Sequence, residues 1–198
     1  NSFGGGSVLA VNGTIATNLV LGGADAYVVR SSLDVATNVA VTATNTSLID
    51  ATNQSTTSSG ENAVGVTLAF NSVGWAPQDL LFNTINTLIG TDLLATEEPV
   101  GANAYIDDTV LDIGGDLSIT AISEARIDAL VGNEATAAGV ALTGAESLSV
   151  GVVLSKNLVS TGTNAWLEDT DALADAAANH VGGEVAISAE DGSTYFRS

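Results

Sequence analysis

The sequence has no cysteine, no methionine and a single histidine in 198 residues. Without cysteine the chain can form neither a disulfide framework nor a thiolate metal site. A Ser-His-Asp triad would have to use His180, and no Gly-x-Ser-x-Gly motif accompanies it. We therefore expect His180 to lie at the surface or at a helix end, and we do not expect an enzyme.

Basic residues are also scarce: 4 Lys and Arg stand against 23 Asp and Glu, which gives a formal net charge of −19. A field of this sign repels phosphate backbones and anionic lipid headgroups, so nucleic acid is not an expected partner. No run of about 20 apolar residues is present, so membrane insertion is not expected either. The chain is nevertheless 45% apolar and only 14% charged, which indicates a folded protein rather than a disordered acidic tail.

What the chain does contain is an internal repeat of three phrases. The decapeptide 150–159 matches 64–73 and 11–20 without a gap, and the eighth residue is always Asn: Asn18, Asn71 and Asn157. The second phrase ends in an aromatic residue (23–27, 101–105, 162–166), and the third alternates apolar and small residues (39–43, 117–121, 185–189). Phrases that recur in a fixed order indicate an architecture of stacked repeats.

The spacing of these phrases divides the chain into copies of about 8–63, 64–149 and 150–198, the last incomplete. The step from the Asn to the aromatic position is nine in the first and third copies and 34 in the second (71 to 105), so an insertion of 34 − 9 = 25 lies within 75–100. Without this insertion the repeat periods are 53 and 61, and we place the difference of eight in a loop at 132–146. Because the chain begins and ends inside a repeat, we interpret it as one segment of a longer polypeptide.

The insertion has the pattern of a helix. Pro77 suits a first helical position, Gly90 can end the helix, and the apolar residues between them follow 3-and-4 spacing. These residues are Leu80, Leu81, Ile85, Leu88 and Ile89. The helix would either cover one side of the protein or bind a neighbouring chain, and both interpretations stay open. A second short helix is predicted over the Ala-rich stretch 170–180.

The remaining segments are typical of short strands, with a polar loop expected at 52–61. The strands are not joined by two-residue Asn-Gly or Asp-Gly hairpins, and small residues alternate with Val, Ile and Leu, as a narrow interior requires. We predict an all-β fold, a parallel β-helix (β-solenoid), in which three turns of about 18–20 residues make one unit. Asn18, Asn71 and Asn157 would occupy equivalent corners and bind turn backbone groups. A β-sandwich array is the alternative.

Acidic pairs are the candidates for chemistry. Two carboxylates can cleave a glycosidic bond, and carboxylate oxygens also suit Ca²⁺. The candidate calcium ligands are Asp107, Asp108, Glu168, Asp169 and Asp171, and no other cofactor is expected; Glu97 and Glu98 form a further pair. The pairs 107–108 and 168–169 fall at matching positions of the repeat. An active site is needed only once, so we favour a structural role for these acids, as solvated turn residues.

The aromatic residues Tyr27, Tyr105 and Trp166 also recur at one repeat position. They would either stack on one another along the coils or form a ridge that binds sugar or another chain. We favour the stack.

The phrases 101–109, 115–121 and 125–129 resemble the repeats of giant secreted bacterial surface proteins of the filamentous haemagglutinin and adhesin type. The resemblance covers most of the chain except 75–100 and 170–180. It implies an extracellular, cell-surface β-helix shaft for attachment or fibre building. Its expected partners are other copies of itself or adjacent repeats of the same chain, and surface polysaccharide. The alternatives are a polysaccharide-binding or -cleaving β-helix and a calcium-dependent β-sandwich adhesin array.

Overall fold

The computed structural model describes residues 9–75, 100–137, 147–168 and 179–197. In these ranges the chain is all-β and all of its strand pairs are parallel. Sheet A holds β1 (Leu9–Val20), β5 (Asn62–Val73) and β9 (Leu148–Val159); sheet B holds β2 (Ala24–Val29), β6 (Val100–Asp107) and β10 (Thr161–Glu168). Sheet C holds β3 (Ser32–Val35), β7 (Val110–Ile113) and β11 (His180–Val181); sheet D holds β4 (Val39–Ser59), β8 (Leu117–Ala137), β12 (Val185–Asp191) and β13 (Thr194–Arg197).

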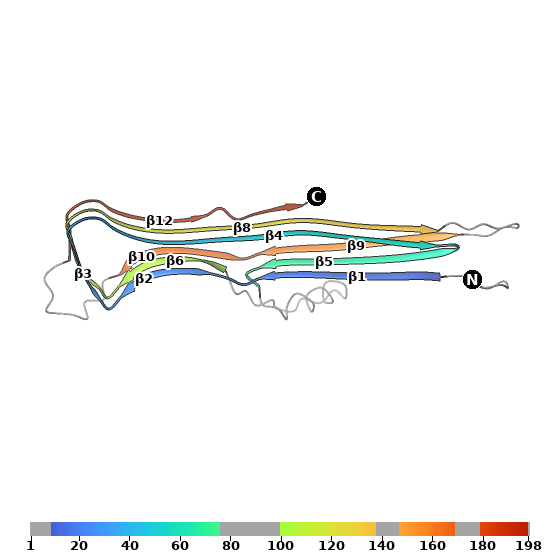
Figure 1. Cartoon of the computed structure of the whole chain (residues 1–198), viewed down its shortest axis with the longest axis horizontal. Helices are drawn as coiled ribbons and strands as arrows, with labels where there is room; N and C mark the ends of the chain where they lie inside the picture. The colour runs from blue at the N-terminus through green and yellow to red at the C-terminus, as the bar shows by residue number, and fades with distance from the viewer. Residues whose placement is uncertain (1–8, 76–99, 138–146, 169–178, 198) are drawn as a thin grey trace, which may run out of the picture.

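The chain makes three similar circuits. It runs along one long side as β1 and β2, turns at β3, and returns along the opposite side as β4 (Figure 1). The second circuit repeats this path with β5 to β8, and the third with β9 to β13. Each circuit therefore adds at least one strand to every sheet. Sheets A and B face sheet D across a narrow interior.

The register follows the repeat that the sequence predicts. Val11 pairs with Val64 and Val64 with Val150, and the aromatic residues of the second phrase pair with one another in the same way. In the third phrase, Val39 and Val185 both pair with Leu117. The sequence alignment of all three phrases is confirmed residue by residue.

The expected size of a coil is wrong. Leu9 pairs with Asn62, the equivalent position of the next repeat, so one repeat unit is one circuit rather than three turns. The strands are longer than predicted, and β4 and β8 reach 21 residues each. The expected polar loop at 52–61 is wrong for the same reason, since β4 continues to Ser59 with Ser55 and Thr57 buried. Hydroxyl side chains fit a strand here because every residue of β4 has a partner in β8.

The eight extra residues of the second copy lie between β8 and β9. Two residues, 60–61, join β4 to β5, whereas ten residues, 138–147, join β8 to β9. The difference, 10 − 2 = 8, agrees with the arithmetic on the sequence and moves the loop slightly toward the C-terminus.

Both predicted helices fall largely outside the described residues. This applies to the contact helix with Leu80, Leu81, Ile85 and Leu88, and to 170–178 of the second helix. His180, the expected end of that second helix, is instead an exposed residue of strand β11. Within the described residues the structure has no helix that could cross a membrane.

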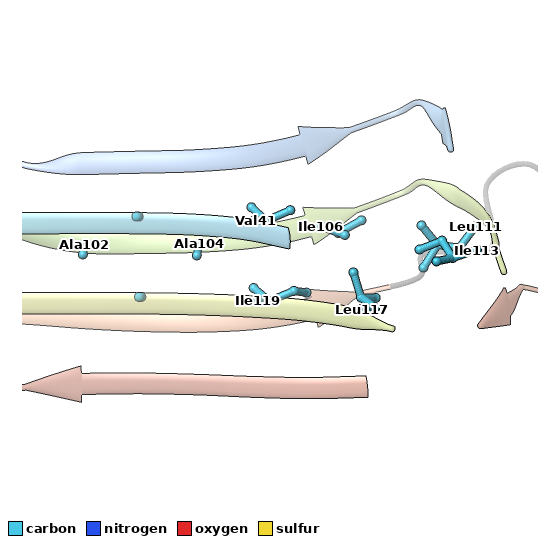
Figure 2. Packing of buried hydrophobic residues seen from close by; sticks show 10 residues of the cluster. Val41, Ala102, Ala104, Ile106, Leu111, Ile113, Leu117 and Ile119 are labelled. Atoms are coloured by element: carbon cyan, nitrogen blue, oxygen red, sulfur yellow. The ribbon is translucent and has the colours of Figure 1, made fainter. Parts of the chain in front are cut away.

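The apolar core is concentrated at the end where the chain turns. Ala102, Ala104 and Ile106 of β6 lie opposite Val41 of β4 and Ile119 of β8, and the cluster ends at Leu111 and Ile113 of β7 (Figure 2). A smaller cluster with Ile49, Val73 and Ile127 lies at the junction of sheets A and B. Burying these side chains supplies the main driving force for stacking one circuit on the next.

Candidate functional site

A ladder of asparagines, buried at its central member Asn71, links the three circuits. The Asn18 Nδ2 donates to Asn71 Oδ1 at 2.8 Å, and the Asn71 Nδ2 donates to Asn157 Oδ1 at 2.9 Å. Asn71 is only 1% exposed. The predicted equivalence of the three residues is confirmed, but their predicted place at corners is wrong: each lies inside a strand of sheet A and its amide bonds the next amide rather than turn backbone. Such a ladder fixes the register, because a slipped strand would leave the buried amide of Asn71 unpaired.

Two further ladders lie at exposed positions. In sheet B, Asn164 Nδ2 donates to Asn103 Oδ1 at 2.9 Å, and Asn103 Nδ2 donates to Asp25 Oδ1 at 2.8 Å. Before sheet D, Asn38 Oδ1 accepts the backbone N–H of Asp116, whose carboxylate accepts the backbone N–H of Glu184. The side chains of Asn38 and Asp116, which directly precede the sheet D strands β4 and β8, thus each accept a backbone hydrogen bond from the following circuit.

The aromatic residues form a continuous stack on the outer face of sheet B. The ring centroids of Tyr27 and Tyr105 are 5.3 Å apart, and those of Tyr105 and Trp166 are 4.1 Å apart with an interplanar angle of 5°. The stack that we favoured from the sequence is confirmed. Tyr27 at its open end is exposed, so the stack also presents an aromatic surface to solvent.

The acidic candidates lie where sheet B ends. Asp107 and Glu168 are paired neighbours on β6 and β10, as their matching repeat positions predict. Asp108 has a φ of 48°, in the left-handed region that Asp tolerates, and its N–H donates to the Glu168 carbonyl. Asp169 and Asp171 lie outside the described residues, as do Glu97 and Glu98.

In the described parts of the chain, no three His, Asp or Glu side chains gather in a group that could hold a metal ion. Asp191 has the one resolved pKa shift among the described groups. Burial raises the pKa of its carboxyl, but hydrogen bonds from Ser193 and Thr161 lower it by more, so the net shift is downward.

Sheet A has an unusual distribution of side chains. Away from the cluster around Val73, most of its inward positions are small or polar: Asn12 Nδ2 donates to Ser55 Oγ across the interior at 2.9 Å, and a Cβ added to Gly65 would meet the side chains of Asn133 and Thr57. The buried hydroxyls of Thr57 and Thr67 have no hydrogen-bond partner among the described residues. Two sheets can approach this closely only because their facing side chains are small.

Most of the outward positions of sheet A are aliphatic instead. Three columns run across its strands: Val11–Val64–Val150, Gly13–Val66–Val152 and Ile15–Leu68–Leu154. Val11 is 67% exposed and Ile15 is 60% exposed. We call the alternate positions that include these columns the outer face of sheet A. Sequence reasoning missed this face as a surface. The signal that could have revealed it is that the larger aliphatic residues of 9–19 all occupy alternate positions: Leu9, Val11, Ile15 and Leu19.

No protein-family model, no curated protein and no solved structure matches the chain. Its function must therefore be inferred from its own residues and geometry.

Proposed function

We propose that the chain is a β-solenoid segment with a structural role, part of the scaffold of a large extracellular bacterial surface or fibre-forming protein, and not an enzyme. The observation that carries this proposal is the in-register parallel pairing of all three repeat phrases, with like side chains stacked on like. A chain that repeats its path in this way builds length and stiffness rather than a single cleft, because each circuit is the template for the next.

The stacked side chains support a mechanical role. The asparagine ladder and the aromatic stack run across the strands, in the direction in which circuits are added. Long parallel strand pairs such as β4 with β8 resist separation because many backbone hydrogen bonds must break together. The negative charge suits a protein that must stay soluble while it is extended.

Of two alternatives considered from the sequence, one disagrees with the strand pairing and the other keeps one supporting observation. The antiparallel sandwich array does not fit, since all strand pairs among the described residues are parallel. The polysaccharide-binding or -cleaving β-helix keeps one supporting observation, the exposed Tyr27 at the end of the aromatic stack. Exposed aromatic rings of this kind can stack on sugar rings.

The test combines imaging with an activity assay on the purified chain. We expect electron microscopy to show a flat, elongated particle with strands about 4.8 Å apart along the stacking direction. Incubation with acidic polysaccharides should release no reducing ends, and adding Ca²⁺ or a chelator should leave the melting temperature unchanged. Release of reducing ends would contradict the proposed scaffold role and favour the polysaccharide-cleaving alternative. A large rise in melting temperature with Ca²⁺ would instead require a calcium-dependent adhesin.

A further inference from the structure

We propose that the half of the molecule that contains sheet A opens as a separate cooperative unit while the end where the chain turns, the turn end, stays folded. This inference concerns local stability, so it goes beyond the scaffold role without depending on it. The unit consists of the segments that lie beyond the asparagine ladder from the turn end: 9–17, 52–70, 130–137 and 147–156. We call these segments the arms.

The interior of the arms buries little apolar surface. Apart from Val131 and Val153, its inward positions carry alanine, glycine, serine, threonine or asparagine. At the turn end, Ile106, Ile113 and Ile119 are fully buried in one apolar cluster. Because the stabilisation from burial is proportional to the apolar area removed from water, the interior stabilises the arms less than the turn end.

Buried polar atoms weaken the arms further. The hydroxyls of Thr57 and Thr67 and the Oδ1 of Asn133 have no hydrogen-bond partner among the described residues. Such atoms lose their bonds to water when the sheets close over them and regain these bonds when the arms open. At the turn end the hydroxyls of Ser123 and Thr163 are in the same state, but the large apolar cluster there has no counterpart in the arms.

Asparagine side chains bridge the two sheets of the arms. Asn53 Nδ2 donates to the Leu68 carbonyl at 3.4 Å, and Asn133 Nδ2 donates to the Val152 carbonyl at 3.1 Å. Both bonds cross the interior between sheet D and sheet A. Water replaces each of these bonds when the arms open, so their net contribution to stability is modest and does not offset the missing apolar core.

The path of the chain allows the arms to open alone. The second and third arms leave the turn end along sheet D and return to it along sheet A, so both ends of each arm lie at the same place (Figure 1). The strand pairs of sheets B and C, and those of 39–51 with 117–129 in sheet D, involve no residue of the arms. Opening the arms therefore breaks none of these pairs, and β4 divides between Ala51 and Asn53.

The test is native-state hydrogen exchange of the full chain in increasing, sub-denaturing urea. Strands of equal position in their sheets give fair comparisons: β5 and β6 are both central, and β8 is the partner of β4 along its whole length. We expect the amides of 63–69 in β5 to exchange at least about tenfold faster than those of 101–106 in β6. The amides of 53–59 in β4 should likewise exchange at least about tenfold faster than those of 41–49.

A pair of variants distinguishes two units from one. Ile119→Val removes a methyl group from the core of the turn end and should accelerate exchange there about 2- to 10-fold. Exchange in the arms should stay unchanged, because the arms open while the turn end is folded. Thr57→Val replaces an orphaned hydroxyl by a methyl group of similar size. It should slow exchange in both regions by the same factor, about threefold, because global unfolding includes opening of the arms.

Other results overturn the proposal. Equal exchange rates in the two parts of β4, or slower exchange in the arms than at the turn end, would mean that the different interiors do not create separate units. If Ile119→Val accelerated exchange in the arms as much as at the turn end, the molecule would unfold as one unit. The shape of the particle tests the scaffold role separately, so none of these results decides that role.

Discussion

The two halves of the molecule distribute their side chains in opposite ways. At the turn end, sheets B and C enclose an apolar interior with sheet D and carry polar and aromatic side chains outside. In the other half, sheet A encloses a small and polar interior with sheet D and carries aliphatic side chains outside. The first half has the pattern of a protein surface that ends in water. The second has the reverse pattern, with aliphatic side chains such as Val11 and Ile15 exposed to solvent.

The largest expected effect separates the two interiors. Ile119 is fully buried in the core of the turn end, so Ile119→Ala should lower the free energy of unfolding by about 2–5 kcal/mol. Thr67 is as deeply buried in the other half, but its hydroxyl has no hydrogen-bond partner in the part of the chain that the structure describes. Thr67→Val should therefore be neutral or raise stability by up to about 1 kcal/mol. Urea denaturation of both variants measures the difference, and a similar loss in both would erase the contrast between the halves.

The next effect concerns buried and exposed ladders. Asn71→Leu removes both bonds of the buried ladder and leaves the Asn18 and Asn157 amides without their partner, which should cost about 2–3 kcal/mol. Asn103→Leu removes two equivalent bonds at an exposed position, where water replaces them, and should cost less than about 1 kcal/mol. Denaturation midpoints compare the two directly. Equal losses of stability in the two variants would show that burial does not change what these hydrogen bonds contribute.

A smaller effect is expected from the aromatic stack. Tyr105 lies between Tyr27 and Trp166, so Tyr105→Leu keeps an apolar side chain of strand-compatible shape but removes both ring contacts. The loss should be about 1–2 kcal/mol, from two pairs that each contribute about 0.5–1.5 kcal/mol. Tyr27→Leu removes one contact and serves as the control, with about half the effect. Trp166 fluorescence should change only in the Tyr105 variant, and no change there would contradict the stack.

The register of the sheets was predictable from the sequence because like residues stack on like. Aligning Asn18, Asn71 and Asn157 was enough to pair all of sheet A, since a parallel strand places identical positions of successive copies side by side. The aromatic residues did the same for sheet B. Sequence identity between copies reports on pairing directly, which makes it more informative than local propensity.

The length of a circuit could not be predicted in the same way. Residues 52–59 have the composition of a loop, and they form a strand because β8 supplies a hydrogen-bonding partner for each of them. The sequence also did not predict which face of sheet A points inward. Alternation in β1 defines two faces, but only the approach of sheet D, which Gly65 and Asn12 permit, decides that the aliphatic side chains point outward.

The smallest effect is a dependence on pH at Asp191, where the third circuit joins sheets B and D. Its carboxylate accepts hydrogen bonds from Thr161 at 2.6 Å and from the Ser193 N–H at 3.0 Å, and its pKa in the folded protein lies below the ordinary value of 3.8. A lowered pKa stabilises the folded state at pH values above 3.8, and this contribution is lost as the pH falls through the folded pKa. Asp191→Asn should therefore lower the melting temperature slightly at neutral pH and by less near pH 3, a value about one unit below the ordinary aspartate pKa. Glu190→Gln removes a neighbouring exposed charge without these bonds and controls for net charge. If the two variants had the same pH profile, the hydrogen bonds of Asp191 would have no part in joining the sheets.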